Sequence, residues 1–268
     1  MIVGIMRVKN EERWITRSID SIQPICHRII ILDDHSTDDT ARIAQNKGVE
    51  VYDSPFSGLD EVRDKNFLLE RTLEADWVLC IDGDEMLARE SVLLLRDLMQ
   101  SDAQCISMRI PYLWDSEDQI RIDGVYGEFR RHSAFRPGRH RYQSTSANGF
   151  HCGNVPIGAR TNTITRDDIK LLHFGYMDAR DRARKYAWYN AVDPANERED
   201  RYRHIAAGLS MAHGDLLRMQ TRMRREAGLP QLTAREMIPR APLACESTAH
   251  AGPLKLELLT TDNVASSR

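Results

Sequence analysis

The chain has 268 residues, of which 41% are hydrophobic and 29% are charged, and its formal net charge at pH 7 is −3. This length and composition fit a globular protein with an ordinary core, organised as one large domain or two small ones. The slightly negative charge gives no general attraction to nucleic acid or anionic membranes. We therefore expect no nucleic-acid partner, and any basic binding surface has to be local.

The cysteines and the hydrophobic pattern bear on the compartment in which the protein works. The five cysteines are scattered and form no CxxC pair, which argues against a disulfide framework or a structural zinc site and favours a reducing compartment. The apolar run at residues 1–6 is too short for a signal peptide, and no apolar stretch is long enough for a membrane span. We expect a cytoplasmic location without a transmembrane segment, with any association with the inner face of the membrane being peripheral.

Short apolar runs alternate with helical patterns over the first hundred residues. The predicted strands are 2–6, 28–32, 49–52 and 76–81, and the predicted helices are 10–22, 35–47 and 60–74. Asn10 is the predicted N-cap of the first helix. The alternation predicts an α/β fold with a doubly wound, mostly parallel sheet and helices on both faces.

Charged side chains follow three of these strands. They are Arg7 and Lys9, Asp33 and Asp34, and Asp82 and Asp84. Ligands bind outside the carboxyl ends of the strands in such a sheet, so we expect these groups to converge on one crevice. No strand is followed by GxGxxG or GxxxxGK[ST], so neither a dinucleotide fold nor a P-loop is supported.

The segment Asp76 to Glu85 is an apolar run that ends in a cluster of carboxylates, the pattern of a buried strand with acid at its tip. Asp82 and Asp84 are two residues apart, and Gly83 between them lets the backbone turn. Carboxylates are hard ligands that suit Mg²⁺ or Mn²⁺ beside a phosphate.

The second half of the chain has a weaker pattern. It predicts a helix at 88–100, strands at 105–114 and 126–135 separated by the polar residues 115–118, an apolar run at 171–176 that ends in a turn, helices at 178–192 and 196–226, and a loosely packed tail after 228. Residues 130–141 are locally basic, and are either a solvated strand face or a groove for an anionic donor or acceptor.

Four motifs stand at the strand ends and on the third helix: Arg7-Val8-Lys9-Asn10-Glu11, Leu32-Asp33-Asp34-His35-Ser36-Thr37-Asp38, Arg63-Asp64-Lys65-Asn66 and Ile81-Asp82-Gly83-Asp84-Glu85. In order and spacing they resemble family-2 glycosyltransferases of the GT-A fold, a Rossmann-like sheet. The resemblance covers about the first 110 residues well, and Leu172-His173-Phe174 with Lys185-Tyr186 is a fainter match. It implies a nucleotide-sugar-binding half at 1–110, an acceptor-binding half at 111–176, a helical extension at 177–228 and a tail at 229–268.

The resemblance also implies roles for individual residues. Asp82 and Asp84 would bind a divalent metal, Mn²⁺ or Mg²⁺, and the donor diphosphate, with Asp84 the favoured direct ligand. His173 would be a third metal ligand, and imidazole suits Mn²⁺ better than Mg²⁺. The structural alternatives are a solvated acidic turn and a structural histidine.

Four further residues match the nucleotide pocket of the family. Asp34 would accept a hydrogen bond from a uracil-like N–H or from the ribose, and the alternative is an N-cap or Asx-turn residue. Arg7 and Lys9 would line the pocket, and Arg63 would reach the base or the diphosphate. The alternative for these three cations is that they are simply solvated.

The general base is where the sequence departs from the family pattern. Inverting members place an Asp or Glu downstream, but residues 142–159 contain no carboxylate and hold His151-Cys152-Gly153-Asn154 instead. Three explanations stay open. His151 is the base, or Asp115, Glu117 or Glu128 supplies it, or the enzyme retains configuration and needs no separate base.

The predicted function is a metal-dependent hexosyl- or N-acetylhexosaminyl-transferase that moves a sugar from a UDP-linked donor to a hydroxyl of a small-molecule or glycan acceptor. One alternative is a sugar-1-phosphate nucleotidyltransferase, which would need a glycine-rich loop after the first strand, whereas Arg7 to Glu11 contains no glycine. Another is a catalytically silent nucleotide-sugar binder. The sequence names neither the sugar nor the acceptor and leaves the oligomeric state open.

Overall fold

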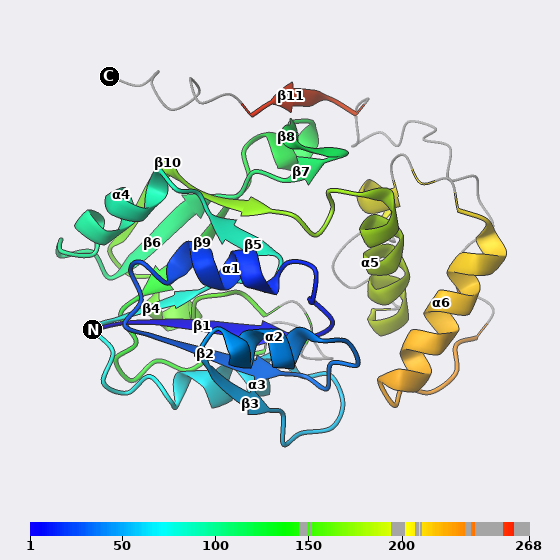
Figure 1. Cartoon of the computed structure of the whole chain (residues 1–268), viewed down its shortest axis with the longest axis horizontal. Helices are drawn as coiled ribbons and strands as arrows, with labels where there is room; N and C mark the ends of the chain where they lie inside the picture. The colour runs from blue at the N-terminus through cyan, green and yellow to red at the C-terminus, as the bar shows by residue number, and fades with distance from the viewer. Residues whose placement is uncertain are drawn as a thin grey trace. The chain divides into compact units, whose positions relative to one another are not determined.

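A computed structural model describes residues 1–144, 150, 152–193, 202–206, 209, 211–233, 237–238 and 254–259 (Figure 1). Contacts along the chain divide it into two compact units. The first unit contains residues 1–56, 60–111 and 128–174, and the second contains residues 57–59, 112–127 and 175–268. The predicted boundaries at 110, 176 and 228 stay predictions.

The first unit is built on an eight-stranded sheet with the order β3-β2-β1-β4-β9-β6-β10-β5. The strands are β1 Ile2–Val8, β2 Arg28–Asp33, β3 Glu50–Asp53, β4 Trp77–Cys80, β5 Glu85–Leu87, β6 Cys105–Arg109, β9 Arg130–Phe135 and β10 Thr163–His173. β1 pairs in parallel with β2 and β4, and so do β2 with β3 and β6 with β10. β9 is antiparallel to both β4 and β6, and β5 is antiparallel to β10. The predicted α/β class and mostly parallel sheet are confirmed.

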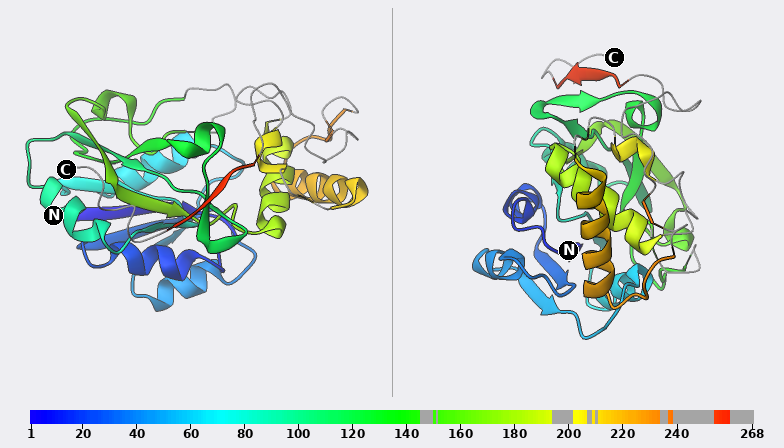
Figure 2. Two further views of the ribbon diagram at one scale, coloured as in Figure 1. Left: turned by 90° about the horizontal axis from the view of Figure 1, so that it is seen from above. Right: turned by 90° about the vertical axis from the view of Figure 1, so that its right-hand side faces the viewer.

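Helices cover both faces of this sheet. They are α1 Ile15–Ile22, α2 Thr40–Asn46, α3 Glu61–Leu69 and α4 Ser91–Leu98. The left view of Figure 2 shows α1 and α2 on one side of the strands and α3, in cyan, on the other, as right-handed crossovers to either side of β1 require. Gly4 in β1 allows α1 to approach closely, because a Cβ there would lie 2.7 Å from Ile22 Cδ1.

The predicted start of the first helix is wrong. α1 begins at Ile15, and Asn10 has φ +55°, a left-handed conformation that Asn tolerates better than most residues. The side chain of Asn10 accepts a hydrogen bond from Thr37 N at 2.7 Å, and its own N–H donates to Ser36 Oγ at 2.9 Å. Asn10 therefore ties the loop after β1 to the loop after β2 instead of capping a helix.

Predictions in the second half of the chain need three corrections. The strand predicted at 126–135 begins at Arg130, because residues 124–127 form a 3₁₀ turn. The strand predicted at 105–114 ends at Arg109. The polar separator is itself part of a strand, β8 Ser116–Arg121, which pairs with β7 Leu113–Trp114 through the backbone and has no apolar pattern of its own.

The second unit contains a three-stranded sheet, β11-β8-β7, and two long helices. Its elements are β7 Leu113–Trp114, β11 Leu256–Leu258, α5 Ala179–Val192 and α6 His213–Glu226, with 3₁₀ turns at Gly124–Gly127 and Arg203–Ala206. Gln220 of α6 donates to Asn190 O of α5 at 3.0 Å. A helical extension is therefore present, but the helix predicted at 196–226 begins at His213, and residues 194–201 lie outside the described part.

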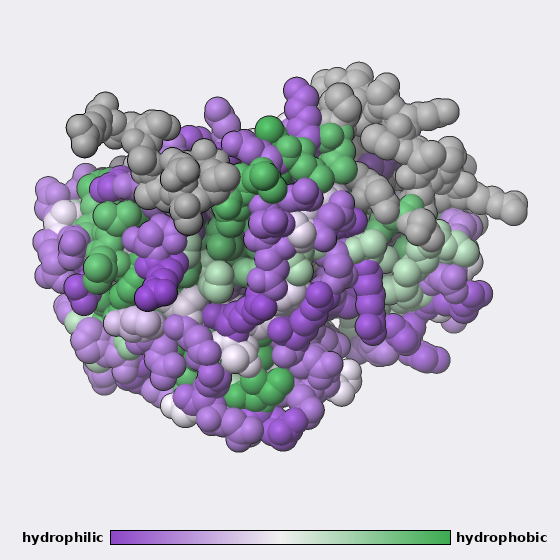
Figure 3. All heavy atoms as spheres, turned by 45° about the horizontal axis from the view of Figure 1, so that its top comes forward, coloured by the Kyte–Doolittle hydropathy of each residue, from purple (hydrophilic) through white to green (hydrophobic). Residues whose placement is uncertain are grey.

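Large hydrophobic residues on the described surface are scattered. The exposed ones are Leu73, Leu93, Val125, Ile157, Leu254, Leu256 and Leu258. In the view of Figure 3, hydrophobic residues form several separate groups between hydrophilic ones. Among the helices that the structure describes, none has the length and apolarity needed to cross a membrane.

Candidate active site

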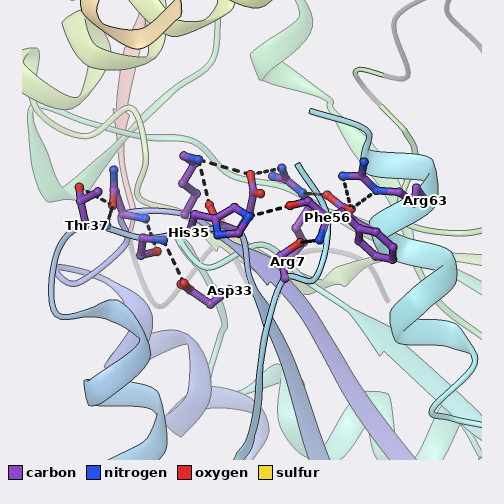
Figure 4. Close-up of polar contacts among 12 residues, drawn as sticks. Arg7, Asp33, His35, Thr37, Phe56 and Arg63 are labelled. Carbon is purple, nitrogen blue, oxygen red and sulfur yellow. Dashed lines mark hydrogen bonds and ion pairs between the residues drawn. The ribbon is translucent and has the colours of Figure 1, made fainter. Parts of the chain in front are cut away.

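Charged side chains from β1, β2 and α3 meet at the carboxyl ends of the strands (Figure 4). Arg7 lies between two carboxylates, with its Nη2 2.5 Å from Asp34 Oδ2 and its Nε donating to Asp64 Oδ2 at 2.8 Å. Arg63 donates to Asp64 Oδ1 from Nε at 2.9 Å and from Nη2 at 2.8 Å. Because Asp64 is fully buried, two guanidinium groups balance a charge that would otherwise be costly.

The Asp34 side chain faces two cations and neither caps a helix nor closes a turn. Lys9 Nζ donates to the backbone oxygen of Asp34 at 2.9 Å and lies 3.6 Å from its Oδ2. The turn is held by Asp33 instead, whose Oδ2 accepts from Ser36 N at 2.9 Å. The structure thus brings Arg7, Lys9 and Asp34 together, with Arg63 joined to them through Asp64.

A planar surface adjoins this ion cluster. The Arg63 guanidinium lies 4.4 Å from the centre of the Phe56 ring, and His35 Nε2 lies 2.6 Å from Phe56 O. Figure 4 shows His35, Phe56 and Arg63 in sequence along one side of the cluster. His35 has φ +55°, so the backbone turns sharply directly after Asp34.

The acidic turn after β4 has one exposed and two buried carboxylates. The Asp82 side chain is 43% exposed, whereas Asp84 and Glu85 are buried. Burial raises the pKa of Glu85 to about 7, although Arg131 opposes this. Glu85 Oε2 accepts from Asp82 N at 2.9 Å, which closes the turn.

The glycine of this turn packs against the loop after β1. A Cβ on Gly83 would lie 3.0 Å from Val8 Cγ1 and 3.2 Å from Glu11 Cγ, and Ser18 Oγ donates to Gly83 O at 2.7 Å. The turn after β4 is therefore fitted closely to the end of β1 and to α1.

Arg131 of β9 is a member of the site that sequence reasoning assigned only to a basic stretch. Its Nη1 lies 3.0 Å from Asp82 Oδ2, and its Nη2 pairs with Glu85. Nearby, Arg130 pairs with Asp167, and Arg136 donates to Ala103 O at 3.0 Å. These three arginines make contacts within the protein, and the antiparallel pairing of β9 with β4 is what places Arg131 beside the acidic turn.

Asp84 and His173 come together from β5 and β10. His173 Nε2 lies 3.7 Å from Asp84 Oδ2, and both residues are buried. The register of the two strands fixes this, because His173 pairs with Glu85 and Phe174 N donates to Asp84 O at 2.9 Å. The pair joins residues that are far apart in the sequence.

The ligand atoms of this pair suit a divalent ion. One carboxylate and one imidazole suit Mn²⁺. Phosphate oxygens and water would complete the coordination. Among the residues that the structure describes, no group of three His, Cys, Asp or Glu side chains is gathered for a metal. Asp84 and His173 would hold the ion, and Asp82 is turned toward Arg131.

Helix α3 also binds the chain on either side of residues 145–151, through residues that sequence reasoning did not single out. Asn66 exchanges two hydrogen bonds with the backbone of Tyr142, and Glu61 accepts from Cys152 N at 2.9 Å. Lys65 donates to Cys152 O at 2.5 Å. The motif at residues 63–66 was the available signal, since Arg63 and Asp64 face the ion cluster and Lys65 and Asn66 face this segment.

The candidate bases are not assigned by these contacts. His151 lies outside the described residues. Asp115 belongs to the second unit, where Arg182 Nη2 donates to its Oδ1 at 2.8 Å and its φ is +63°. Glu117 belongs to that unit and Glu128 to the first. Burial raises the pKa of the Cys152 thiol, which disfavours this cysteine as a nucleophile.

Comparison with known proteins agrees with the predicted class. The model of Glycosyl transferase family 2 matches residues 5–170. The chain is 44% identical over 82 residues to the uncharacterized glycosyltransferase RT0209 of Rickettsia typhi, covering 31% of this chain and 27% of that one. It is 30% identical over 176 residues to the lipopolysaccharide core biosynthesis glycosyltransferase LpsC of Rhizobium meliloti, covering 62% and 60%. Solved structures include S. aureus TarS, with a TM-score of 0.48, 10% identity, and 83% and 70% coverage.

The family match covers more than half of the chain, so the chain belongs to glycosyl transferase family 2. The predicted family and its GT-A fold are confirmed, and the relatives' names agree with the predicted enzyme class. The chain spans only about a quarter of the length of the Rickettsia relative that it matches. Nothing in these matches supports the nucleotidyltransferase alternative.

Proposed function

We propose that the protein is a metal-dependent glycosyltransferase that moves a sugar from a nucleoside-diphosphate donor, a UDP-sugar, to a hydroxyl of an acceptor. The observation that carries this proposal is the buried Asp84–His173 pair at the strand ends, where Nε2 and Oδ2 are 3.7 Å apart. A carboxylate and an imidazole brought together in a family-2 enzyme fit an ion beside a leaving diphosphate.

The nucleoside would lie over the cluster of Arg7, Lys9, Asp34 and Arg63. Asp34 offers a carboxylate oxygen to an N–H of the base or to the ribose, and Arg7 and Lys9 hold that carboxylate in place. Phe56 and the Arg63 guanidinium present planar faces beside it. This arrangement supports a nucleotide end for the site at β1 and β2.

The diphosphate would lie at the acidic turn, between His173 and the nucleotide cluster, as we call the group formed by Arg7, Lys9, Asp34 and Arg63. When bound, the divalent ion would stabilise the negative charge that develops on the leaving diphosphate. Asp84 and His173 would hold that ion, and Arg131 supplies a further positive charge beside Asp82. Residues in or next to β5, β9 and β10 would thus supply the charges that hold the ion and the diphosphate.

Acceptor activation is assigned to His151 as a working proposal. An imidazole with a pKa near neutrality can take the proton from an attacking hydroxyl. Asp115, Glu117 or Glu128 as base, and a retaining reaction without a separate base, are the competing possibilities, and a full-rate His151→Ala variant would exclude His151.

The acceptor is proposed to be a glycan. Support comes from LpsC, a relative that is named for lipopolysaccharide core biosynthesis and aligns over 62% of this chain. A small-molecule acceptor is the competing outcome. Such an acceptor is compatible with the cytoplasmic location expected from the sequence, with any association with the inner face of the membrane being peripheral.

The test is turnover with a panel of UDP-sugars and Mn²⁺, measured as released UDP, with and without a core oligosaccharide acceptor. The proposal expects release for one donor, faster with the acceptor, and loss of turnover with EDTA or in Asp84→Asn. Undiminished turnover in EDTA would remove the metal from the proposal. Failure of every nucleotide sugar would remove the transferase activity itself.

A further inference from the structure

Lys65 is a buried cation whose three N–H donors all have acceptors. Its residue is only 6% exposed, and Nζ lies 2.5 Å from Cys152 O, 3.4 Å from Gly153 O and 2.9 Å from Asn154 Oδ1. A lysine ammonium has three hydrogens to donate, so no further partner is needed. Lys65 therefore fixes residues 152–154 to helix α3.

The Lys65 ammonium stays charged despite its burial. Burial lowers its pKa, but the nearby acidic groups, Glu61 foremost, raise it, and the pKa ends above the ordinary value. The hydrogen bonds from Lys65 to residues 152–154 are therefore charge-assisted, which makes them stronger than bonds between neutral groups.

Asn154 links this cation to the acidic turn. Because its Oδ1 accepts from Lys65, its amide orientation is defined and Nδ2 faces the other way. Nδ2 donates to Cys80 O at 3.3 Å, at the end of β4, and lies 3.5 Å from Asp82 Oδ1. Asn154 is 3% exposed, so it reaches Asp82 from inside the protein.

Asp82 is thereby contacted at both carboxylate oxygens. Arg131 Nη1 lies 3.0 Å from Oδ2 on one side, and Asn154 lies near Oδ1 on the other. The Asp82 side chain is 43% exposed, and an exposed aspartate without such contacts would sample several rotamers.

We propose that Lys65 and Asn154 are positioning residues of the donor site, which fix the orientation of the Asp82 carboxylate, a group that the family resemblance assigns to metal and diphosphate binding. This inference rests on the proposed function. Partners that orient the groups around a metal typically change its affinity or the activity about 10- to 100-fold when removed. Lys65 acts at one remove, through Asn154.

The structure also offers a matched control for a role that is only structural. Asn66 lies next to Lys65 on α3 and donates to Tyr142 O at 3.0 Å while accepting from Tyr142 N at 2.9 Å. Asn66 has an amide side chain like Asn154, and it joins helix α3 to the chain just before residues 145–151. In the part of the chain that the structure describes, its side-chain hydrogen bonds are with Tyr142 and not with Asp82.

The experiment measures UDP affinity in the presence of Mn²⁺ by calorimetry for the full chain and its variants. Asn154→Ala and Lys65→Met should each raise the Kd about tenfold. Asn66→Ala should lower the melting temperature but leave the Kd within about twofold. In an Asp82→Ala background, Asn154→Ala should cause no further loss, because both changes act through one group.

An unchanged Kd in Asn154→Ala would overturn the inference, and so would an equal loss in the Asp82→Ala background. If Lys65→Met does not fold, Asn154→Ala decides alone. If the wild type binds no UDP, the proposed donor fails, and ligand-free crystal structures of wild type and Asn154→Ala then decide the positioning role. The Asp82 carboxylate has to rotate in the variant, and an unmoved carboxylate contradicts the inference.

Discussion

At the scale of single residues, Asp34 is a buried carboxylate for which we propose roles in both stability and nucleotide binding. Its side chain is almost fully buried against Arg7 and Lys9. Asp34→Asn keeps the shape but removes the charge that these two cations face. We expect UDP affinity to fall about tenfold and the unfolding free energy to fall by about 2 kcal/mol, measured by calorimetry and urea denaturation.

The control for this prediction is Asp39→Asn. Asp39 pairs with Arg42 on the surface, where both side chains are more than half exposed. Exposed pairs contribute little, so the unfolding free energy and the UDP affinity of Asp39→Asn should both stay close to those of the wild type. Undiminished UDP affinity in Asp34→Asn would contradict its assignment to the nucleotide pocket.

For His173, the proposed role in metal binding can be separated from a role in packing. Its Nε2 faces Asp84 Oδ2 at 3.7 Å, and His173→Gln replaces an imidazole ligand with a weaker amide. Binding of UDP with Mn²⁺ should weaken about tenfold or more, whereas binding of UDP in EDTA should match the wild type. Equal losses under both conditions would show that His173 contributes by packing and not by holding a metal.

At the scale of elements, the turn after β4 depends on a residue without a side chain. A Cβ on Gly83 would press on Val8 and Glu11 at 3.0 to 3.3 Å. Gly83→Ala should therefore shift the turn, with a loss of about 1 to 3 kcal/mol in unfolding free energy and weaker binding of UDP with Mn²⁺.

Gly214→Ala is the matched control for that change. Gly214 lies in the first turn of α6, where a Cβ meets only Arg218 Nη1 at an ordinary 3.5 Å. Alanine there should stabilise the helix by about 0.5 to 1 kcal/mol. If both glycine variants gave the same change in urea denaturation, the close fit of Gly83 would not be important.

Helix α3 supplies much of the site, and its start depends on Asp60. The Asp60 side chain caps the helix by accepting from Arg63 N at 2.9 Å. Asp60→Ala should cost about 1 kcal/mol of stability and should weaken UDP binding, because residues 61–66 contact both the nucleotide cluster and residues 152–154.

Asp178→Ala separates capping from binding. Asp178 caps α5 in the same way, accepting from Asp181 N at 2.9 Å, and belongs to the second unit. Its loss should cost similar stability without changing UDP affinity. An effect on affinity from Asp178→Ala alone would contradict the assignment of donor binding to the first unit.

The sequence predicts the elements of the first hundred residues well for a physical reason. β1, β2 and β4 are buried along most of their length, so they appear as continuous apolar runs between helical patterns. The first half of β10 has no such run, because its residues are only partly buried, and β8 is polar throughout its first half. Backbone pairing fixes these strands, and that pairing is invisible to a hydrophobic pattern.

The candidate site follows the same division. Asp34, Asp82 and Asp84 follow strands that the sequence predicts, so their place at the carboxyl ends of those strands is predictable. Arg131 reaches the site only because β9 inserts antiparallel between β4 and β6. Asn154 contacts it from a segment without regular structure, which no periodicity indicates.

At the scale of the whole molecule, we propose one donor site in which a nucleotide and a divalent ion bind together. Both parts of this proposed site belong to the first unit: the nucleotide cluster at β1 and β2, and the Asp84–His173 pair. A ligand that binds only the folded protein raises its melting temperature by linkage, and two ligands that strengthen each other's binding raise it by more than the sum of their separate effects.

The most direct test is a thermal-unfolding measurement of the wild type and Asp84→Asn with UDP, with Mn²⁺ and with both. The account predicts that UDP and Mn²⁺ together raise the wild-type melting temperature by more than the two separate shifts combined. It also predicts that this extra stabilisation disappears with EDTA and in Asp84→Asn. Equal stabilisation by UDP in EDTA, or no stabilisation by UDP with Mn²⁺, would contradict a metal-assisted nucleotide site.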